Sequence, residues 1–174
     1  LYVLSADKVS LTLAPDTVNT FTDGKAYTAA FEKQPNACIC SRDDLVINGT
    51  GTLNVQGNFN NGIGTKNDLR IAGGVITVSA VKNALKGNDS VAIQNGAITL
   101  TAGKDAIKAD NEDKPDKGYV YIAGGDIRIT AGDDAIQATQ DVTTTGGALT
   151  VTATGKAVNS KGSQDVASGV INGK

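Results

Sequence analysis

The sequence DLRIAGGVITV, at residues 68–78, alternates apolar residues with other residues on both sides of a Gly-Gly pair. Alternation with a period of two is typical of a strand that buries one face, and the glycine pair favours a tight turn between two such strands. Similar segments begin at residues 44, 90, 119 and 141, the first of them with one extra residue near its glycines. The stretch is therefore one copy of an internal repeat, and this repeat decides the fold.

The repeat recurs at a nearly constant step. With residues 44, 68, 90, 119 and 141 as starts, the steps are 24, 22, 29 and 22 residues, and the longest step contains an inserted loop that opens at Asp110. Each step also contains a shorter second motif, as at residues 82–89, 104–111 and 133–140. Three short strands cannot bury a core alone, whereas stacked copies align their apolar positions into ladders. A β-sandwich would need hairpin turns and would not explain columns at one fixed step.

These features predict an all-β protein, a single-stranded right-handed parallel β-helix (a solenoid) of about five to seven coils of about 22 residues. Residues 9–13 continue the register upstream, and Val3 is expected in the column of Ile63 and Leu85. We expect residues 1–174 to form a single domain. The sequence opens directly on strand-like residues, and it has no signal peptide or apolar run of membrane length. We therefore expect a fragment or mature portion of a longer chain, with any export signal and adjoining domains outside this sequence.

The composition excludes several function classes. The net charge is −2, and no basic patch is interleaved with aromatic residues, so nucleic acid is not an expected partner. The chain has no His, Met or Trp, which removes the usual general base near neutral pH and the commonest zinc and copper ligand. Oxygen donors from Asp, Asn, Thr and Ser remain, and these donors suit calcium.

The two cysteines, Cys38 and Cys40, stand two residues apart. On a strand they would point to the same side, and a disulfide across one residue would be strained. A metal pair would need further soft ligands, which the sequence lacks. We expect both cysteines to be free or structural.

Alignment of the coils stacks side chains about 4.8 Å apart, which is the spacing between neighbouring strands. One polar column reads Asn61, Asn83, Asp105, Asp134 and Lys156, and the column beside it reads Lys82, Lys104 and Asp133. Stacked carboxylates repel one another unless a cation neutralises them, and calcium tolerates irregular oxygen geometry. We therefore predict a calcium site at Asp105, Asp133 and Asp134.

A second oxygen-rich group follows the same short strand and leads into the inserted loop. Its candidate calcium ligands are Asp89, Asp110, Asn111 and Asp113. The spacing is not that of an EF-hand loop. The alternative is a solvated acidic loop that uses Asp and Asn to form turns.

The outward face between the two acidic columns carries cationic and amide side chains. We predict that this face binds carbohydrate through Lys82, Lys86, Lys104, Lys108 and Gln137. A cationic strip beside calcium suits an acidic sugar polymer, and a long sheet face with repeated polar groups matches a polymer better than a small molecule. The alternative is a row of solvated lysines that protects a long flat sheet from pairing.

Three motifs carry a resemblance to a known family: NACICSRDDLVINGTG at residues 36–51, DKGYVYI at residues 116–122 and DAIQA at residues 134–138. From about Val3 to Lys161 the sequence resembles the clostridial carbohydrate-binding-domain family of secreted right-handed β-helix proteins, whose fold is related to that of pectate lyases. The resemblance implies a bacterial protein that is secreted or attached to the cell surface. It also implies bound calcium and affinity for cellulose and pectic polymers.

The resemblance extends to acidic positions of the family. Asp105, Asp110, Asp133 and Asp134 stand at these positions, which supports them as calcium ligands. The sequence departs from the family pattern at Asn83, Asn88 and Thr139. These departures argue against calcium at residues 82–89.

The leading hypothesis is a non-catalytic, calcium-dependent module that binds plant cell-wall polysaccharide, either pectin (polygalacturonate) or cellulose. The first alternative is a calcium-dependent polysaccharide lyase in which Lys108 removes the proton α to a carboxylate. Its neighbours Asp105 and Asp110 favour the protonated ammonium, which is the wrong form for a base, unless bound calcium offsets them. The second alternative is a structural stalk or adhesin segment of a surface protein.

Aromatic side chains that could stack on sugar rings are scarce. Away from the first coil and its ladder, the candidates are Tyr27, Phe31, Phe59, Tyr119 and Tyr121. This scarcity favours a charged or soluble glycan over crystalline cellulose.

Overall fold

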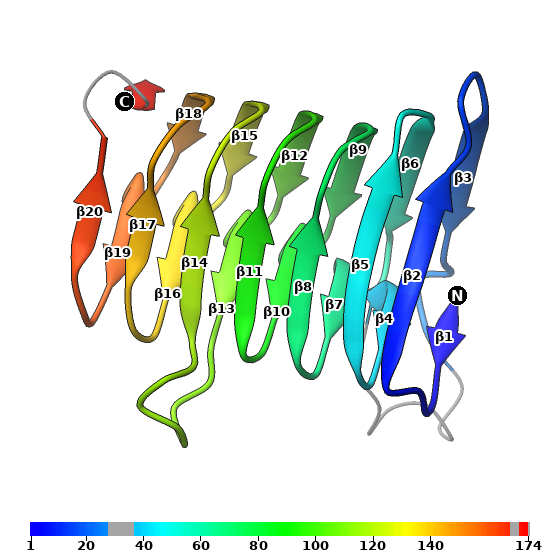
Figure 1. Cartoon of the computed structure of the whole chain (residues 1–174), viewed down its shortest axis with the longest axis horizontal. Helices are drawn as coiled ribbons and strands as arrows, with labels where there is room; N and C mark the ends of the chain where they lie inside the picture. Colours follow the sequence, from blue (N-terminus) through cyan, green and yellow to red (C-terminus); the bar gives the residue numbers. More distant parts are fainter. Residues whose placement is uncertain (28–36, 168–170, 174) are drawn as a thin grey trace.

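The computed structural model describes residues 1–27, 37–167 and 171–173, and their regular secondary structure consists of strands alone. Three parallel sheets, here named A, B and C, run along the molecule, and each has seven strands (Figure 1). No helix that could cross a membrane occurs among the described residues.

The strands of the three sheets have the following bounds. Sheet A contains β1 (Tyr2–Val3), β4 (Ala37–Ser41), β7 (Asn61–Thr65), β10 (Leu85–Gly87), β13 (Ile107–Ala109), β16 (Ile136–Ala138) and β19 (Val158–Ser160). Sheet B contains β2 (Lys8–Leu13), β5 (Asp44–Gly49), β8 (Asp68–Ile71), β11 (Ser90–Ile93), β14 (Tyr119–Ile122), β17 (Val142–Thr144) and β20 (Gln164–Val166). Sheet C contains β3 (Val18–Thr22), β6 (Thr52–Gly57), β9 (Val75–Ala80), β12 (Ala97–Ala102), β15 (Asp126–Ala131), β18 (Ala148–Ala153) and β21 (Ile171–Gly173).

Each coil contributes one strand to each sheet in the order A, B, C, so the described strands form seven coils. In Figure 1 the chain rises at the front through sheet B, crosses the top, descends at the back and advances by one coil, which is a right-handed winding. Every strand pairs in parallel with its counterparts in the adjacent coils. The predicted right-handed parallel β-helix is therefore confirmed.

Ladders of apolar side chains fill the space between the sheets. Within a strand the burial alternates, as in β9, β12 and β15, because successive side chains point to opposite faces. The backbone register stacks Ile71 on Ile93 and Ile122 in sheet B, and Ile76 on Ile98 and Ile127 in sheet C. All six side chains are buried. One hydrophobic core thus runs the length of the solenoid.

Val3 does not join the column of Ile63, contrary to the prediction. It stands opposite Ser41, which in turn stands opposite Thr65, whereas Ile39 stands opposite Ile63. The predicted position is shifted by two residues. A shift of two keeps a side chain on the same face of the strand, so the alternation of apolar residues could not detect it.

A column of glycines forms the turn between sheets B and C. Gly74, Gly96, Gly125 and Gly147 have φ angles of 102°, 128°, 100° and 87°, in the left-handed region that other residues rarely adopt. A Cβ atom on Gly125 would stand 2.8 Å from the carbonyl oxygen of Gly96 in the preceding coil. The Gly-Gly pair of the repeat therefore serves both the turn and the close stacking of coils.

The long step of the repeat places residues 110–118 in a loop between β13 and β14. Asn111 Oδ1 accepts hydrogen bonds from the backbone N–H groups of Asp113 (2.9 Å) and Lys114 (3.1 Å). At the far end of the loop, the Gly118 N–H donates to the carbonyl oxygen of Asp89 (2.6 Å). These contacts fasten the loop at both ends, so the strands on either side keep their register.

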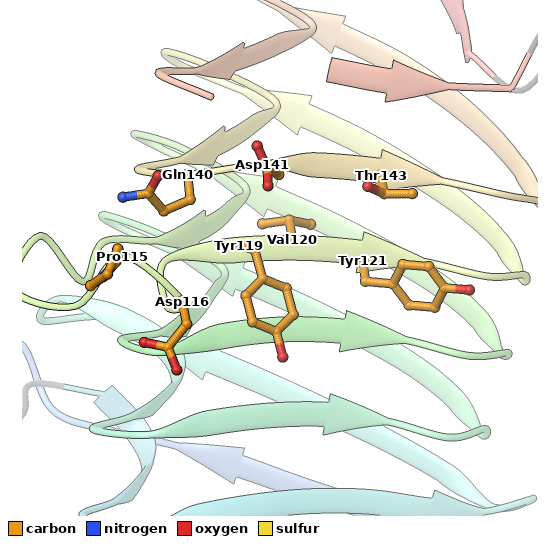
Figure 2. A pocket seen from close by; sticks show the side chains of 8 residues that line it. All are labelled: Pro115, Asp116, Tyr119, Val120, Tyr121, Gln140, Asp141 and Thr143. Carbon is orange, nitrogen blue, oxygen red and sulfur yellow. The ribbon is translucent and has the colours of Figure 1, made fainter. Parts of the chain in front are cut away.

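The loop also forms one side of a hollow on the outer face of sheet B. Pro115 and Asp116 of the loop line it together with Tyr119 and Tyr121 of β14 (Figure 2). We call this feature the tyrosine hollow.

Replacing Gly125 with Ala should destabilise the fold, because the new side chain would meet a left-handed φ angle and the backbone of the preceding coil. We expect the free energy of unfolding to fall by about 2 kcal/mol or more, measured by urea denaturation followed by circular dichroism. Gly24→Ala is the matched control, since its φ is not left-handed and its nearest contact would be at 3.5 Å. Equal effects of the two substitutions would contradict this account of the turn.

Candidate functional site

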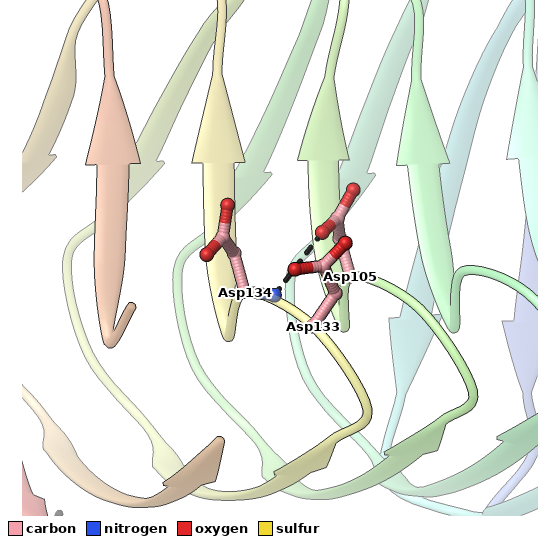
Figure 3. A group of neighbouring side chains, drawn as sticks. All are labelled: Asp105, Asp133 and Asp134. Carbon is pink, nitrogen blue, oxygen red and sulfur yellow. Dashed lines mark hydrogen bonds between the residues drawn. The ribbon is translucent and has the colours of Figure 1, made fainter. Parts of the chain in front are cut away.

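Three carboxylates meet at the turns that lead into sheet A. Asp105 precedes β13, and Asp133 and Asp134 precede β16 in the next coil. One carboxylate oxygen of each residue lies within 4.8 Å of the other two (Figure 3). We call these residues the acidic cluster. Among the described residues, no other group of three or more Asp, Glu, Cys or His side chains converges in this way.

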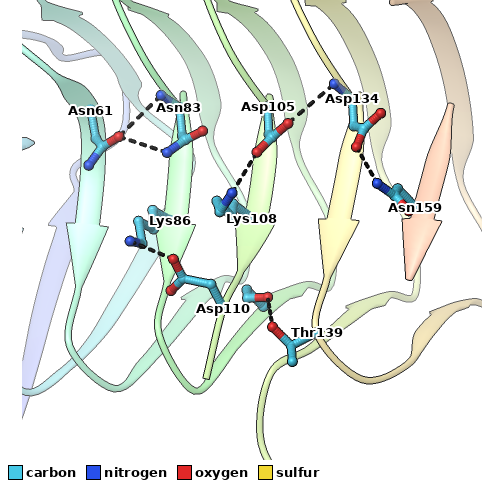
Figure 4. A network of polar contacts seen from close by, with 10 residues as sticks. Asn61, Asn83, Lys86, Asp105, Lys108, Asp110, Asp134, Thr139 and Asn159 are labelled. Atoms are coloured by element: carbon cyan, nitrogen blue, oxygen red, sulfur yellow. Dashed lines mark hydrogen bonds and ion pairs between the residues drawn. The ribbon is translucent and has the colours of Figure 1, made fainter. Parts of the chain in front are cut away.

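The coil register holds two of the three carboxylates in place. Asp105 and Asp134 are buried, and the backbone N–H of Asp134 donates to Asp105 Oδ1 (3.2 Å; Figure 4). The N–H of Lys156 in the following coil donates to Asp134 Oδ1 (2.7 Å). Two coils before the Asp105–Asp134 hydrogen bond, the N–H of Asn83 donates to Asn61 Oδ1 in the same manner (3.1 Å). This polar column is therefore a ladder in which a side chain accepts a hydrogen bond from the backbone of the next coil.

The third carboxylate, on Asp133, is exposed and accepts no hydrogen bond from a described residue. Lys108 Nζ lies 2.8 Å from Asp105 Oδ2 and is the cation nearest to the cluster's buried part. Three carboxylates and this one ammonium leave a local charge of −2. A carboxylate oxygen has two lone pairs, so an oxygen that accepts one hydrogen bond can still bind a cation.

The predicted carbohydrate-binding residues lie on one face, as the coil alignment requires. Lys86, Lys108 and Gln137 form a column on the outer face of sheet A. Lys82 and Lys104 are exposed beside it, and neither forms an ion pair with another described residue.

The central lysines, however, are neutralised. Lys86 Nζ pairs with Asp110 Oδ2 at 2.7 Å, and Lys108 pairs with Asp105. Two acceptors beside these pairs, Asp110 Oδ1 and Gln137 Oε1, are buried and have no hydrogen-bond partner among the described residues. A buried acceptor without a donor is unusual, and a bound hydroxyl group, water or cation would satisfy it. The structure thus gives a mixed polar face rather than a bare cationic strip.

The second predicted calcium group does not converge. Asp89 Oδ1 accepts a hydrogen bond from Asn111 Nδ2 (2.6 Å), and Asp89 Oδ2 lies 3.7 Å from Lys117 Nζ. Asp110 is paired with Lys86, and the exposed Asp113 contacts Asn111 through its backbone N–H. These contacts match the alternative in which Asn111 forms a turn. Calcium binding by these four residues stays a sequence-based prediction.

Neither Cys38 nor Cys40 belongs to a site. Both are thiols buried in β4. Burial raises the pKa of the Cys40 thiol to about 12 and also raises the pKa of the Cys38 thiol. Both groups therefore stay protonated near neutral pH, as expected of structural cysteines.

The aromatic candidates divide into packed and exposed residues. Tyr27 and Phe59 pack on each other, with ring centroids 4.6 Å apart. Phe31 lies outside the described residues. Tyr119 and Tyr121 are exposed on the outer face of sheet B.

Fold and site define the class of this protein: it is a parallel β-helix with a carboxylate cluster and a polar column on the outer face of one sheet. The chain belongs to the family of carbohydrate-binding domain-containing proteins, because the sequence model of that family matches residues 1–174. This result bears out the carbohydrate-binding family expected from the three motifs.

Two relatives support this assignment. A carbohydrate-binding domain-containing protein of Acetivibrio thermocellus is 49% identical over 175 residues, which are 98% of this chain and 60% of the relative. A solved structure described as the polysaccharide lyase-like protein from C. thermocellum, gadolinium derivative, is 48% identical with a TM-score of 0.95. That comparison covers 99% of this chain and 70% of the solved one. The chain thus spans about 60% of the length of the Acetivibrio relative.

Sequence reasoning missed several residues that the structure brings to these sites. Asn159 Nδ2 donates to Asp134 Oδ2 (2.6 Å), and Gln140, Asp141 and Thr143 line the tyrosine hollow. The coil alignment contained the signal, because residue 159 continues the column of Lys108 and Gln137. The same alignment places residue 143 beside Tyr121.

Removal of the Asp134 carboxylate should destabilise the protein even without metal. The Asp134→Ala variant would leave the N–H of Lys156 and the amide of Asn159 without acceptors. We expect the free energy of unfolding in chelator to fall by about 1–3 kcal/mol. Asp133→Ala, in the same cluster but exposed, should change it by less than about 0.5 kcal/mol. Equal losses for both variants in urea denaturation would contradict the ladder.

Proposed function

We propose that this chain is a non-catalytic, calcium-dependent module that binds an acidic polysaccharide, with polygalacturonate as the model ligand. The observation that carries the proposal is the acidic cluster beside the lysine column on the outer face of sheet A. Family membership supports a carbohydrate as the partner. Calcium and the acidic character of the polymer are the parts that the proposal adds.

The donor set of the acidic cluster fits calcium. Three carboxylates supply only oxygen ligands, and their oxygens already lie within 4.8 Å of one another without an ion. Calcium takes six to eight oxygens, so this site would leave coordination positions for other ligands. Asp105, Asp133 and Asp134 would hold the ion, and the ion would supply positive charge for carboxylates of a uronate polymer. A similar protein has been solved as a gadolinium derivative, and gadolinium, like calcium, is a hard cation that prefers oxygen ligands.

Lys108 links the cation to the glycan. Its ammonium occupies one oxygen of Asp105 at 2.8 Å, so a cation that takes this oxygen would compete with the lysine. A displaced Lys108 would add a free positive charge to the face where Lys82 and Lys104 are exposed. Cation binding would thus raise the positive charge of the face in two ways, which suits an anionic polymer.

The alternative function is a polysaccharide lyase, which the description of the solved relative as lyase-like favours. Its base would be Lys108. Asp133 of the cluster is exposed to water, and a site open to water favours binding over catalysis.

The ligand also suggests where the protein acts. Plant cell-wall polysaccharides lie outside the bacterial cell, so we propose that the protein is secreted or attached to the cell surface. Pectin is the favoured polymer and cellulose the second, because the face described here is polar and charged.

The proposal is tested by calorimetric titration of polygalacturonate into the protein, with calcium and then with excess chelator. We expect binding with calcium, no binding in chelator, and no unsaturated product in the ultraviolet absorbance. Asp133→Ala should weaken polygalacturonate binding about tenfold or more, because it removes a calcium ligand. The Asp133 carboxylate accepts no hydrogen bond from the described residues, so its loss should act through the cation alone.

Asp126→Ala is the matched control, since it removes an exposed carboxylate whose partner is Arg128, on sheet C. It should bind as the native protein does. Product formation would identify a lyase and move attention to Lys108. If calcium stabilised the protein but no polysaccharide bound, the structural stalk would be the better account.

A further inference from the structure

Sheet B carries an aromatic surface that the proposed function does not use. Tyr119 and Tyr121 alternate with the buried Val120 and Ile122 in β14, so both rings lie on the outer face. They are 36% and 37% exposed. Among the large hydrophobic side chains that the described part of the chain exposes, they are the only aromatic ones. Residues two apart on a strand lie about 6.7 Å apart, so the two rings are neighbours along the strand.

The adjacent coils leave both tyrosines partly exposed. In the preceding coil their counterparts are the small residues Ser90 and Ala92. In Figure 2 the ring of Tyr119 reaches toward that coil, whereas the ring of Tyr121 extends along its own strand. The Tyr121 hydroxyl lies 3.3 Å from Thr145 Oγ1, which orients the ring without burying it. Both rings therefore present apolar surface to solvent.

The tyrosine hollow is walled on two sides. Pro115 and Asp116 come from the inserted loop, and Gln140, Asp141 and Thr143 come from the following coil. Its volume is about 220 Å³, below the roughly 300–1,000 Å³ of pockets that enclose drug-sized ligands. The shape is therefore an open recess for part of a larger ligand. The insertion that breaks the repeat here has a physical role, because it builds one wall of this recess.

The charge of the hollow restricts its ligand. Two carboxylates, on Asp116 and Asp141, line it, and no Lys or Arg does. Lys117 of the same loop is paired with Asp89 (3.7 Å). An acidic sugar would meet repulsion at such a surface. The hydroxyl groups of a neutral sugar can instead donate hydrogen bonds to carboxylate and amide oxygens, and the apolar face of a pyranose ring can stack on an aromatic ring.

We propose that the tyrosine hollow is a second glycan subsite, which binds neutral pyranose units on Tyr119 and Tyr121 without calcium. It goes beyond the function proposed above, because it lies on a different sheet, needs no calcium and contains no residue of the acidic cluster. The chain would then hold an acidic glycan on sheet A and a neutral glycan on sheet B. Such a module could bind both components of one composite material.

The test is calorimetric titration of neutral β-1,4-linked hexasaccharides of glucose, xylose and mannose into the native protein in excess chelator. We expect at least one of them to bind. Tyr119→Ala and Tyr121→Ala should each weaken that binding about tenfold, as is typical when a central tyrosine is truncated. Tyr119→Phe and Tyr121→Phe, which keep the rings, should bind within about threefold of the native protein. A galacturonate hexasaccharide should bind at least about tenfold more weakly than the neutral ligand in chelator.

Matched controls separate this site from the one on sheet A. Thr99→Ala, an exposed substitution on sheet C, should leave neutral binding unchanged. The variant with both tyrosines replaced by Ala should keep native calcium-dependent binding of polygalacturonate, which also shows that it is folded.

Three results would overturn the proposal. The first is that the native protein binds none of the neutral glycans. The second is that the double variant binds them as well as the native protein does. The third is that a tyrosine variant with a native circular dichroism spectrum loses binding of both the neutral glycan and polygalacturonate. The last result would place the tyrosines on the acidic-glycan surface. Failure of polygalacturonate to bind the native protein would leave this subsite standing and remove only the calcium proposal.

Discussion

The structure depends on the hydrogen-bond register between successive coils. Each strand of the inner coils has its backbone partners one coil before and one coil after it, so every coil must return to the same position in cross-section. Insertions are tolerated only where the chain can leave and rejoin that register. Residues 110–118 meet this condition, because Asn111 and Gly118 close the loop against the coil that carries Asp89. The glycine turns meet the related condition that adjacent coils approach closely.

The same register creates the acidic cluster. A polar side chain at one position of the coil stands next to its counterpart about 4.8 Å away in the next coil. The side-chain oxygen of an Asn at this position accepts a hydrogen bond from a backbone N–H of the next coil, as Asn61 Oδ1 does from the N–H of Asn83. An Asp makes the same hydrogen bond but adds a charge that must be balanced, here by Lys108 at Asp105. The change from Asn to Asp along one column therefore turns a structural ladder into a place where a cation can bind.

A solenoid also separates binding surfaces, because its sheets face different directions. The outer face of sheet A carries the lysine column and the acidic cluster, whereas the outer face of sheet B carries two tyrosines between carboxylates. The lysine column covers two coils and is followed by Gln137, whereas the two tyrosines occur in a single coil and stand opposite Ser90 and Ala92 of the preceding one. The burial of alternate residues in each strand leaves the outward positions open to substitution without loss of the core.

The sequence by itself determined the repeat, the parallel β-helix, the apolar ladders and the membership of Asp105, Asp133 and Asp134 in one cluster. These follow from a fixed step and a period of two, which the order of residues contains. Only the tertiary structure decided the pairing of Lys86 with Asp110, the use of Asn111 to close the loop, and the register of Val3. It also decided that Pro115 and Asp116 of the inserted loop lie beside Tyr119 and Tyr121. Such contacts depend on side-chain directions and on the path of an irregular loop, and no periodic pattern encodes either of them.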